Sequence, residues 1–129
     1  MKKIFLIVLM VLPLLLGQTV VRDNPVSVAW DEVAPMGGDT ISYEVFIAPL
    51  GDYPAAQAVG QTELLAMDVM IANEGDWVVG VRTVRTITSN GEVLYSEINW
   101  SDINGLATPD PFVVRHYEAP AAPSNLRRQ

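Results

Sequence analysis

The stretch WVVGVRTVRT, at positions 77–86, decides the fold class of this chain. Apolar or β-branched side chains recur there at every second position, which is the period of a β-strand with one face on a core. The β-branched residues would crowd a helix, and Gly80 would weaken one. The stretch therefore predicts a long central strand. Its inner face carries four residues: Trp77, Val79, Val81 and Thr83.

Other stretches of the chain show a similar alternation between clusters of turn-forming residues. Asn90-Gly91 predicts a hairpin after the central strand, because both residues tolerate positive φ. Residues 55–63 fit either a helical turn or a short edge strand, and we favour the strand. The remaining predicted strands cover 26–30, with Trp30 inward, and 41–48, 64–71 and 92–100.

Several short strands separated by turns predict an all-β fold, an antiparallel immunoglobulin-like β-sandwich of about seven strands. We place this domain at residues 18–107. The chain contains no cysteine, so it has neither a disulfide framework nor a thiolate site. A domain of about 85 residues buries enough apolar surface to fold without disulfides.

The N-terminus has the pattern of a secretory signal. Lys2 and Lys3 precede an apolar run at 4–16, and Gly17 follows it. The run is shorter than the roughly 20 residues of a membrane span. We predict a signal peptide at 1–17, cleaved to leave Gln18 first, and no stable membrane span after cleavage. The predicted location is secreted or cell-surface, with the periplasm as an alternative. An uncleaved N-terminal anchor is the competing interpretation.

The C-terminal segment 108–129 is predicted to be a proline-rich tail or linker. Its prolines include those of the sequence APAAP at 119–123. Within this segment, 112–117 has the composition of a short strand, and that alternative stays open.

Beyond residue 17 the chain carries six arginines against fifteen acidic residues, a balance of −9. Such a surface repels phosphate backbones, so nucleic acid is not an expected partner. The expected partner is a protein or a carbohydrate at the cell exterior, and the chain is expected to be a monomer.

Residues 22–103 resemble a fibronectin type III domain. VSVAW at 26–30 resembles the second strand of that family with its core tryptophan, and ISYEVFI at 41–47 resembles the third. Ile71, followed six residues later by Trp77, resembles the family's leucine and corner tyrosine. YSE at 95–97 resembles the last strand. The resemblance implies the sandwich fold and a role in binding or spacing.

The chain departs from this family in three places. Trp77 stands where the family has tyrosine, so the hydroxyl-to-backbone bond of a tyrosine corner is either missing or made by the indole N–H. Asn73-Glu74-Gly75 replaces the usual Pro-Gly, and the first strand lacks the proline-rich opening. APSNL at 122–126 resembles that opening in a further domain.

The sequence offers no convincing catalytic, cofactor or metal site, and we predict a protein that is not an enzyme. His116 lacks a neighbouring nucleophile motif. We interpret the acid pairs as solvated turn residues, since glycosidase chemistry needs two carboxylates across a cleft. The pairs are Asp31 with Glu32, Glu74 with Asp76, and Asp102 with Asp110.

Asp102-x-Asn104-Gly105 is a fragment of an oxygen-rich turn that could bind calcium, but it lacks the downstream glutamate of a full loop. The aromatic residues offer a second possibility. Trp30 and Trp77 are assigned to the core rather than to a sugar-stacking platform. Trp100 and Phe46 are expected to be at least partly exposed.

We therefore expect an exported, non-catalytic binding or spacer module of the fibronectin type III kind, which binds through loops or an edge strand. The sequence does not identify its ligand-binding residues or require a cofactor. Two alternatives are a structural subunit of a surface assembly and an accessory module of a secreted hydrolase.

Overall fold

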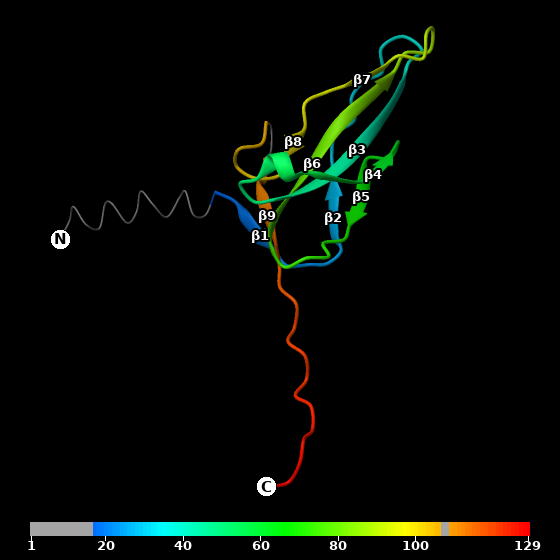
Figure 1. The fold of residues 1–129 in the computed structure, drawn as a ribbon. Helices are drawn as coiled ribbons and strands as arrows, with labels where there is room; N and C mark the ends of the chain where they lie inside the picture. Colours follow the sequence, from blue (N-terminus) through cyan, green and yellow to red (C-terminus); the bar gives the residue numbers. More distant parts are fainter. Residues whose placement is uncertain (1–16, 107–108) are drawn as a thin grey trace, which may run out of the picture.

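The computed structural model describes residues 17–106 and 109–129, and almost all of its regular structure is β-strand (Figure 1). The prediction of an all-β fold is therefore confirmed. In chain order the elements are β1 Thr19–Val21, β2 Val26–Ala29, β3 Thr40–Pro49, the 3-10 helix η1 Tyr53–Ala55, β4 Gln57–Thr62, β5 Ala66–Val69, β6 Gly75–Thr86, β7 Val93–Tyr95, β8 Asn99–Trp100 and β9 Phe112–His116.

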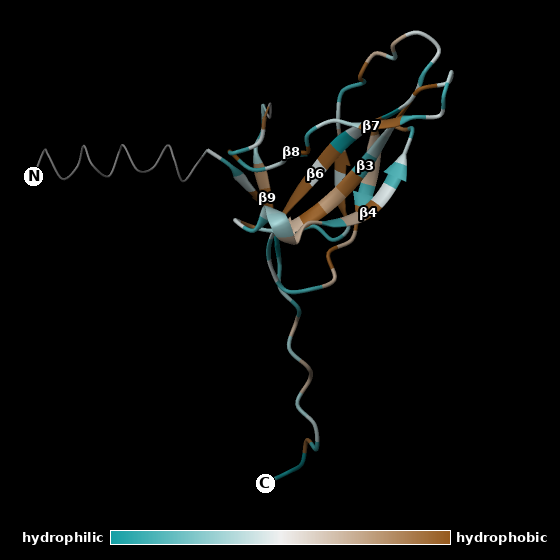
Figure 2. Ribbon diagram, turned by 45° about the horizontal axis from the view of Figure 1, so that its top comes forward, coloured by the Kyte–Doolittle hydropathy of each residue, from teal (hydrophilic) through white to brown (hydrophobic). Residues whose placement is uncertain are grey.

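The strands form two sheets that enclose one apolar core, as in a β-sandwich. The larger sheet has the order β1-β9-β6-β3-β4, with β7 and β8 also paired to β6, and the smaller sheet contains β2 and β5. Figure 2 shows the apolar centre of β6 and β3 flanked by more polar edges. Both sheets contribute to the core, whose buried residues are Val26, Val28, Val45, Ile47, Val69, Ile71, Trp77, Val79 and Val114.

The centre of the larger sheet is the antiparallel pair β3–β6. Its register runs from Thr40 opposite Thr86 to Pro49 opposite Trp77. The side chains of Trp77 and Val79 are buried, which confirms the predicted inner face at this end of the strand. Val81 and Thr83 are only half-buried. The inner face of β6 is therefore covered at one end and partly open at the other.

The smaller sheet consists of β2 and β5 in antiparallel register, with Val26 opposite Val69. Asn24 extends this pairing beyond the strands: its side-chain amide donates to the carbonyl of Ile71 at 2.9 Å and accepts from the Ile71 N–H at 3.0 Å. A side chain thus replaces a strand residue at this end of the sheet.

A second, smaller apolar cluster lies on the outer face of the larger sheet. Ala48, Val78 and Val113 are buried there beneath Tyr53 of η1 and Trp100 of β8. The rings of Tyr53 and Trp100 stack with centroids 5.2 Å apart. The larger sheet is therefore covered on both faces at the end where β3 finishes, which a simple alternation of buried and exposed residues does not predict.

Phe46 corrects one expectation, because its side chain is buried rather than exposed. It lies on the outer face of β3, where the Arg82 guanidinium covers its ring at 5.0 Å and also lies 4.1 Å from the centroid of Tyr95. Arg82 also forms an ion pair with Glu44 at 2.6 Å. The planar guanidinium of Arg82 thus covers the Phe46 ring and shields it from solvent.

The returning strand predicted at 92–100 is divided into β7 and β8, both paired to β6. Between them, Ser96 binds β6 through its side chain, which accepts from the Thr83 N–H at 2.8 Å. Trp100 lies opposite Gly80 of β6, where an added Cβ would be 2.5 Å from Cγ2 of Ile98 and 2.7 Å from the indole ring. A larger residue at position 80 would force these side chains to move.

The predicted domain boundary also needs correction, because part of the expected tail 108–129 belongs to the sheet. β9 pairs antiparallel with β6, with Trp77 opposite Val114, and parallel with β1. Val113 and Val114 are buried. The sandwich thus extends to His116 and includes one parallel pair, and the strand alternative for 112–117 is the correct one.

Residues 117–129 extend away from the sandwich and are exposed (Figure 1). The predicted signal peptide lies outside the described residues except for Gly17. Within 17–106 and 109–129, no helix is long and apolar enough to cross a membrane.

Trp77 closes the corner before β6. Its indole N–H donates to the carbonyl of Asn73 at 3.1 Å, while the ring is 9% exposed. The bond that the sequence left open is therefore made by the indole, which ties the turn at 73–75 to the core.

Replacing Trp77 by alanine should lower the free energy of unfolding by about 3–5 kcal/mol, since it empties an aromatic core site. Trp77→Phe should cost less than Trp77→Ala because it keeps an aromatic ring. It should still cost some stability because it loses the hydrogen-bond donor. Trp100→Ala should also cost less, because Trp100 is half-buried. Denaturant melts rank the three variants. A Trp77→Ala protein as stable as Trp100→Ala would contradict the inner-face assignment.

Truncation tests the corrected boundary. A chain that ends at Glu118 keeps β9 and should melt within about 2 °C of the full chain. A chain that ends at Asp110 loses Val113 and Val114, each worth about 1.5–3 kcal/mol of burial. It should melt more than about 10 °C lower. Equal melting temperatures for the two truncations would show that β9 adds nothing to stability.

Candidate functional site

One concave feature of the described residues is an apolar groove on one side of the sandwich, with a volume of about 650 Å³. This is within the range of about 300–1,000 Å³ that is usual for ligand sites. One wall is the edge of β2 and the residues after it, and the other is the inner face of β6 with β8. The lining residues used below are Val28, Ala29, Trp30, Val81, Thr83 and Phe112.

The groove exists because β2 has no strand beside it on this side within 17–106 and 109–129. The segment that precedes it, β1, pairs with β9 of the larger sheet instead. The inner face of β6 is consequently uncovered where Val81 and Thr83 lie, and these two side chains are half-buried.

Aromatic residues shape the deep part of the groove. Trp30 packs on Tyr43 with ring centroids 5.6 Å apart and an interplanar angle of 54°. The Tyr43 hydroxyl accepts from the Val33 N–H at 2.9 Å, which holds the loop after β2 against the wall. The indole N–H of Trp30 is buried and has no acceptor within the described part of the chain. Trp30 therefore faces inward, as predicted, but it is half-buried: it packs against the core and forms a wall of the groove.

The rim of the groove combines exposed apolar side chains with negative charge. Val33 is 43% exposed and Leu106 is 66% exposed. Asp31 and Glu97 also line the groove, and its described lining includes no basic side chain. An apolar interior with an acidic rim suits an apolar ligand that carries positive charge at its ends.

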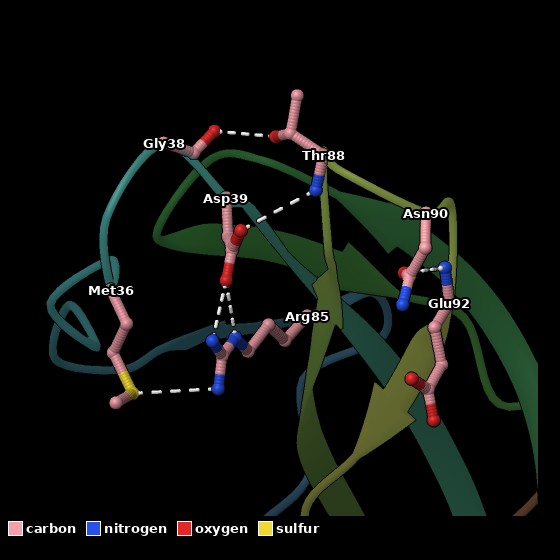
Figure 3. A network of polar contacts seen from close by, with 7 residues as sticks. All are labelled: Met36, Gly38, Asp39, Arg85, Thr88, Asn90 and Glu92. Atoms are coloured by element: carbon pink, nitrogen blue, oxygen red, sulfur yellow. Dashed lines mark hydrogen bonds and ion pairs between the residues drawn. The ribbon is translucent and has the colours of Figure 1, made fainter.

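The loops at one end of the sandwich form a second candidate surface (Figure 3). Asp39 accepts from two nitrogens of Arg85 at 2.6 Å each, which joins the loop after β2 to the end of β6. The Thr88 hydroxyl donates to the carbonyl of Gly38 at 2.6 Å. Met36 is 61% exposed, and its sulfur lies 3.6 Å from an Arg85 nitrogen. These polar contacts hold the loops together.

Asp102, the first residue of the possible calcium turn, is 2% exposed. Its Oδ2 accepts from the Tyr53 hydroxyl at 2.6 Å, and its Oδ1 is buried without a partner among the described residues. The N–H of Gly105 donates to the carbonyl of Asp102 at 2.8 Å. The carboxylate thus anchors η1 beside β8, whereas the sequence predicted a solvated turn residue at Asp102.

The other acidic residues that the sequence singled out do not converge on one site. Asp76 pairs with Arg115 at 2.9 Å, and Glu74 accepts from the Glu118 N–H at 2.8 Å. Asp110 is exposed, whereas Asp102 is buried. Within the described ranges no group of three or more His, Asp and Glu side chains could hold a metal ion.

His116 is the last residue of β9 and lies opposite Gly75 of β6, so its position is set by the sheet. Phe112 of the same strand lines the groove, although sequence reasoning placed it in a tail. The signal that could have found it was the apolar character of 112–117. The sequence carries no such signal for the partial exposure of Val81 and Thr83, because this exposure depends on which strands lie next to β2.

No protein-family model, curated protein or solved structure matches this chain. The groove and the edge of β2 are therefore the features from which a function can be inferred.

The Tyr53–Asp102 bond predicts a stability loss at high pH. Burial raises the pKa of the Tyr53 hydroxyl, and its hydrogen bond to Asp102 raises it further. Because the pKa in the folded state exceeds the unfolded value of about 10, this contribution is present below that pH and is lost as the pH rises. Chemical melts from about pH 9 to about pH 11 should show a smaller loss for Tyr53→Phe than for the wild type.

Tyr117→Phe is the matched control, since Tyr117 is 58% exposed. It should keep the wild-type loss of stability at high pH. If Tyr53→Phe loses as much stability at high pH as the wild type, the loss comes from other titrating groups.

Proposed function

We propose that this chain is an exported, non-catalytic binding or spacer module of the fibronectin type III kind, which contacts a protein or a carbohydrate at or outside the cell surface. The single observation that carries the binding role is the apolar groove beside β2. It leaves Val81, Thr83 and Trp30 partly uncovered, although a closed sandwich would bury such residues. Uncovered apolar surface of this kind marks sites of interaction.

Two features of the sequence support a location outside the cytoplasm. Residues 1–17 have the pattern of a cleaved signal, and the chain beyond them has a balance of −9. An acidic surface favours solubility. Stability without cysteine leaves the domain indifferent to the redox state of its surroundings.

The alternative of a structural subunit of a surface assembly has one observation in its favour. Within the described residues, β4 pairs only with β3, and β2 pairs only with β5. Unpaired edges can join the strands of another copy. Concentration-dependent assembly in size-exclusion chromatography would favour this alternative over a monomeric module.

Capture by the immobilised mature chain, residues 18–129, tests the proposal. The chain is offered separately to the protein and polysaccharide fractions of the native cell exterior. We expect saturable retention of one component from one fraction. Thr83→Trp should reduce it at least about tenfold, because the larger ring fills the groove.

Thr40→Trp is the matched control, since Thr40 is exposed and lies outside the groove. It should bind like the wild type, and melting curves should confirm that both variants fold. Saturable retention that both variants keep would contradict binding through the groove. No saturable retention from either fraction would contradict the binding role.

A further inference from the structure

The edge of β2 presents backbone groups to the groove. The Trp30 N–H donates to the carbonyl of Leu65 on β5 at 3.0 Å. In an antiparallel pair, hydrogen-bonded and non-hydrogen-bonded positions alternate along the strand. Val28 and Val26 therefore bond toward β5, while the N–H and C=O groups of Ser27 and Ala29 point to the opposite edge.

That opposite edge is unpaired within 17–106 and 109–129, and Ser27 and Ala29 are exposed. Ala29 also lines the groove. Within the described residues, one surface thus carries the unpaired backbone donors and acceptors of Ser27 and Ala29, and the apolar groove lies beside it. A strand that pairs with β2 would place every second side chain toward this groove.

We propose that the groove binds an extended polypeptide segment, which adds to the free edge of β2 as a third strand of the small sheet. Its alternate side chains are apolar and pack on Val81, Thr83 and Phe112. This inference rests on the proposed binding function and names the class of partner as polypeptide rather than carbohydrate.

The charge of the rim defines the ends of this segment. Asp31 and Glu97 line the groove, and no basic side chain is among its described lining residues. Three of the arginines in the sandwich already pair with acids: Arg82 with Glu44, Arg85 with Asp39 and Arg115 with Asp76. The excess negative charge favours a segment with lysine or arginine at its ends.

The length of the segment follows from β2, which spans four residues. At about 3.3 Å per residue this edge is about 13 Å long. About four paired residues cover it, and two of these direct their side chains into the groove.

The test uses the mature chain, residues 18–129, and two synthetic peptides, Lys-Val-Thr-Val-Thr-Val-Lys and Glu-Val-Thr-Val-Thr-Val-Glu, with blocked ends. Binding is followed by titration calorimetry and by amide hydrogen exchange. At low salt the lysine peptide should bind at least about tenfold more tightly than the glutamate peptide. It should also slow exchange at Ser27 and Ala29. No binding of the lysine peptide up to about 1 mM would overturn the proposal.

Ala29→Pro removes a donor at the edge of β2 without removing a bond to β5, because proline is tolerated where its N–H would face outward. It should weaken binding of the lysine peptide at least about tenfold. Ala66→Pro is the matched control, since Ala66 lies directly opposite on β5 and directs its N–H to the other edge of the same sheet. It should bind like the wild type, and equal losses in the two variants would overturn the proposal.

A change in the peptide keeps the test independent of protein folding. Backbone N-methylation blocks one edge of a strand when placed at the valines and the other edge when placed at the threonines. One of these two methylated peptides should lose binding and the other should keep it. Equal affinity of both would exclude strand addition.

Two outcomes separate this proposal from the function on which it rests. Capture of an exterior component that Ala29→Pro leaves unchanged would overturn strand addition while the binding function stands. A dimer of the wild-type chain that Ala29→Pro dissociates would show that the edge of β2 pairs with a second copy, which also overturns the proposal.

Discussion

The register between β3 and β6 is the constraint on which the rest of the structure depends. It places Val45 opposite Val81 and Ile47 opposite Val79. A slip of one residue would move every side chain of one strand to the other face. Four other strands of the large sheet attach directly to this pair: β4 to β3, and β7, β8 and β9 to β6. The remaining strand, β1, attaches to β9.

The two sheets differ greatly in size, and this difference creates the groove. The larger sheet uses β1 through its parallel pairing with β9, so the small sheet contains only β2 and β5. The core is closed around Trp77 and Val79, where β2 and β5 of the small sheet pack on β3, β6 and β9 of the larger sheet. Farther along β6, no strand among the described residues extends beyond the edge of β2, and apolar side chains stay partly accessible.

Polar contacts hold the ends of the sandwich where apolar packing is thin. Asp39 and Arg85 join the loop after β2 to the end of β6 (Figure 3), and Asp76 and Arg115 join β6 to β9 at the other end of the sandwich. Such half-exposed ion pairs contribute little stability each, about 0–1 kcal/mol. The Asp39–Arg85 pair fixes the position of a loop whose backbone is not in a sheet. A groove between fixed walls loses less entropy on binding than one between mobile walls.

The sequence by itself determined the existence and phase of the main strands. Alternation at 77–86 and 41–48 predicted both long strands, and the positions of Trp77 and Val79 followed from their phase, because one face of a strand must be buried. It did not determine pairing between segments that lie far apart along the chain. The pairing of 112–116 with both β1 and β6, the cover of Phe46 by Arg82, and the Tyr53–Asp102 bond all join such segments. The groove likewise depends on which strand lies beside β2, and only the tertiary structure decides this. The spacing of apolar residues along a strand shows which of its faces is buried, but it does not show which strand is the neighbour.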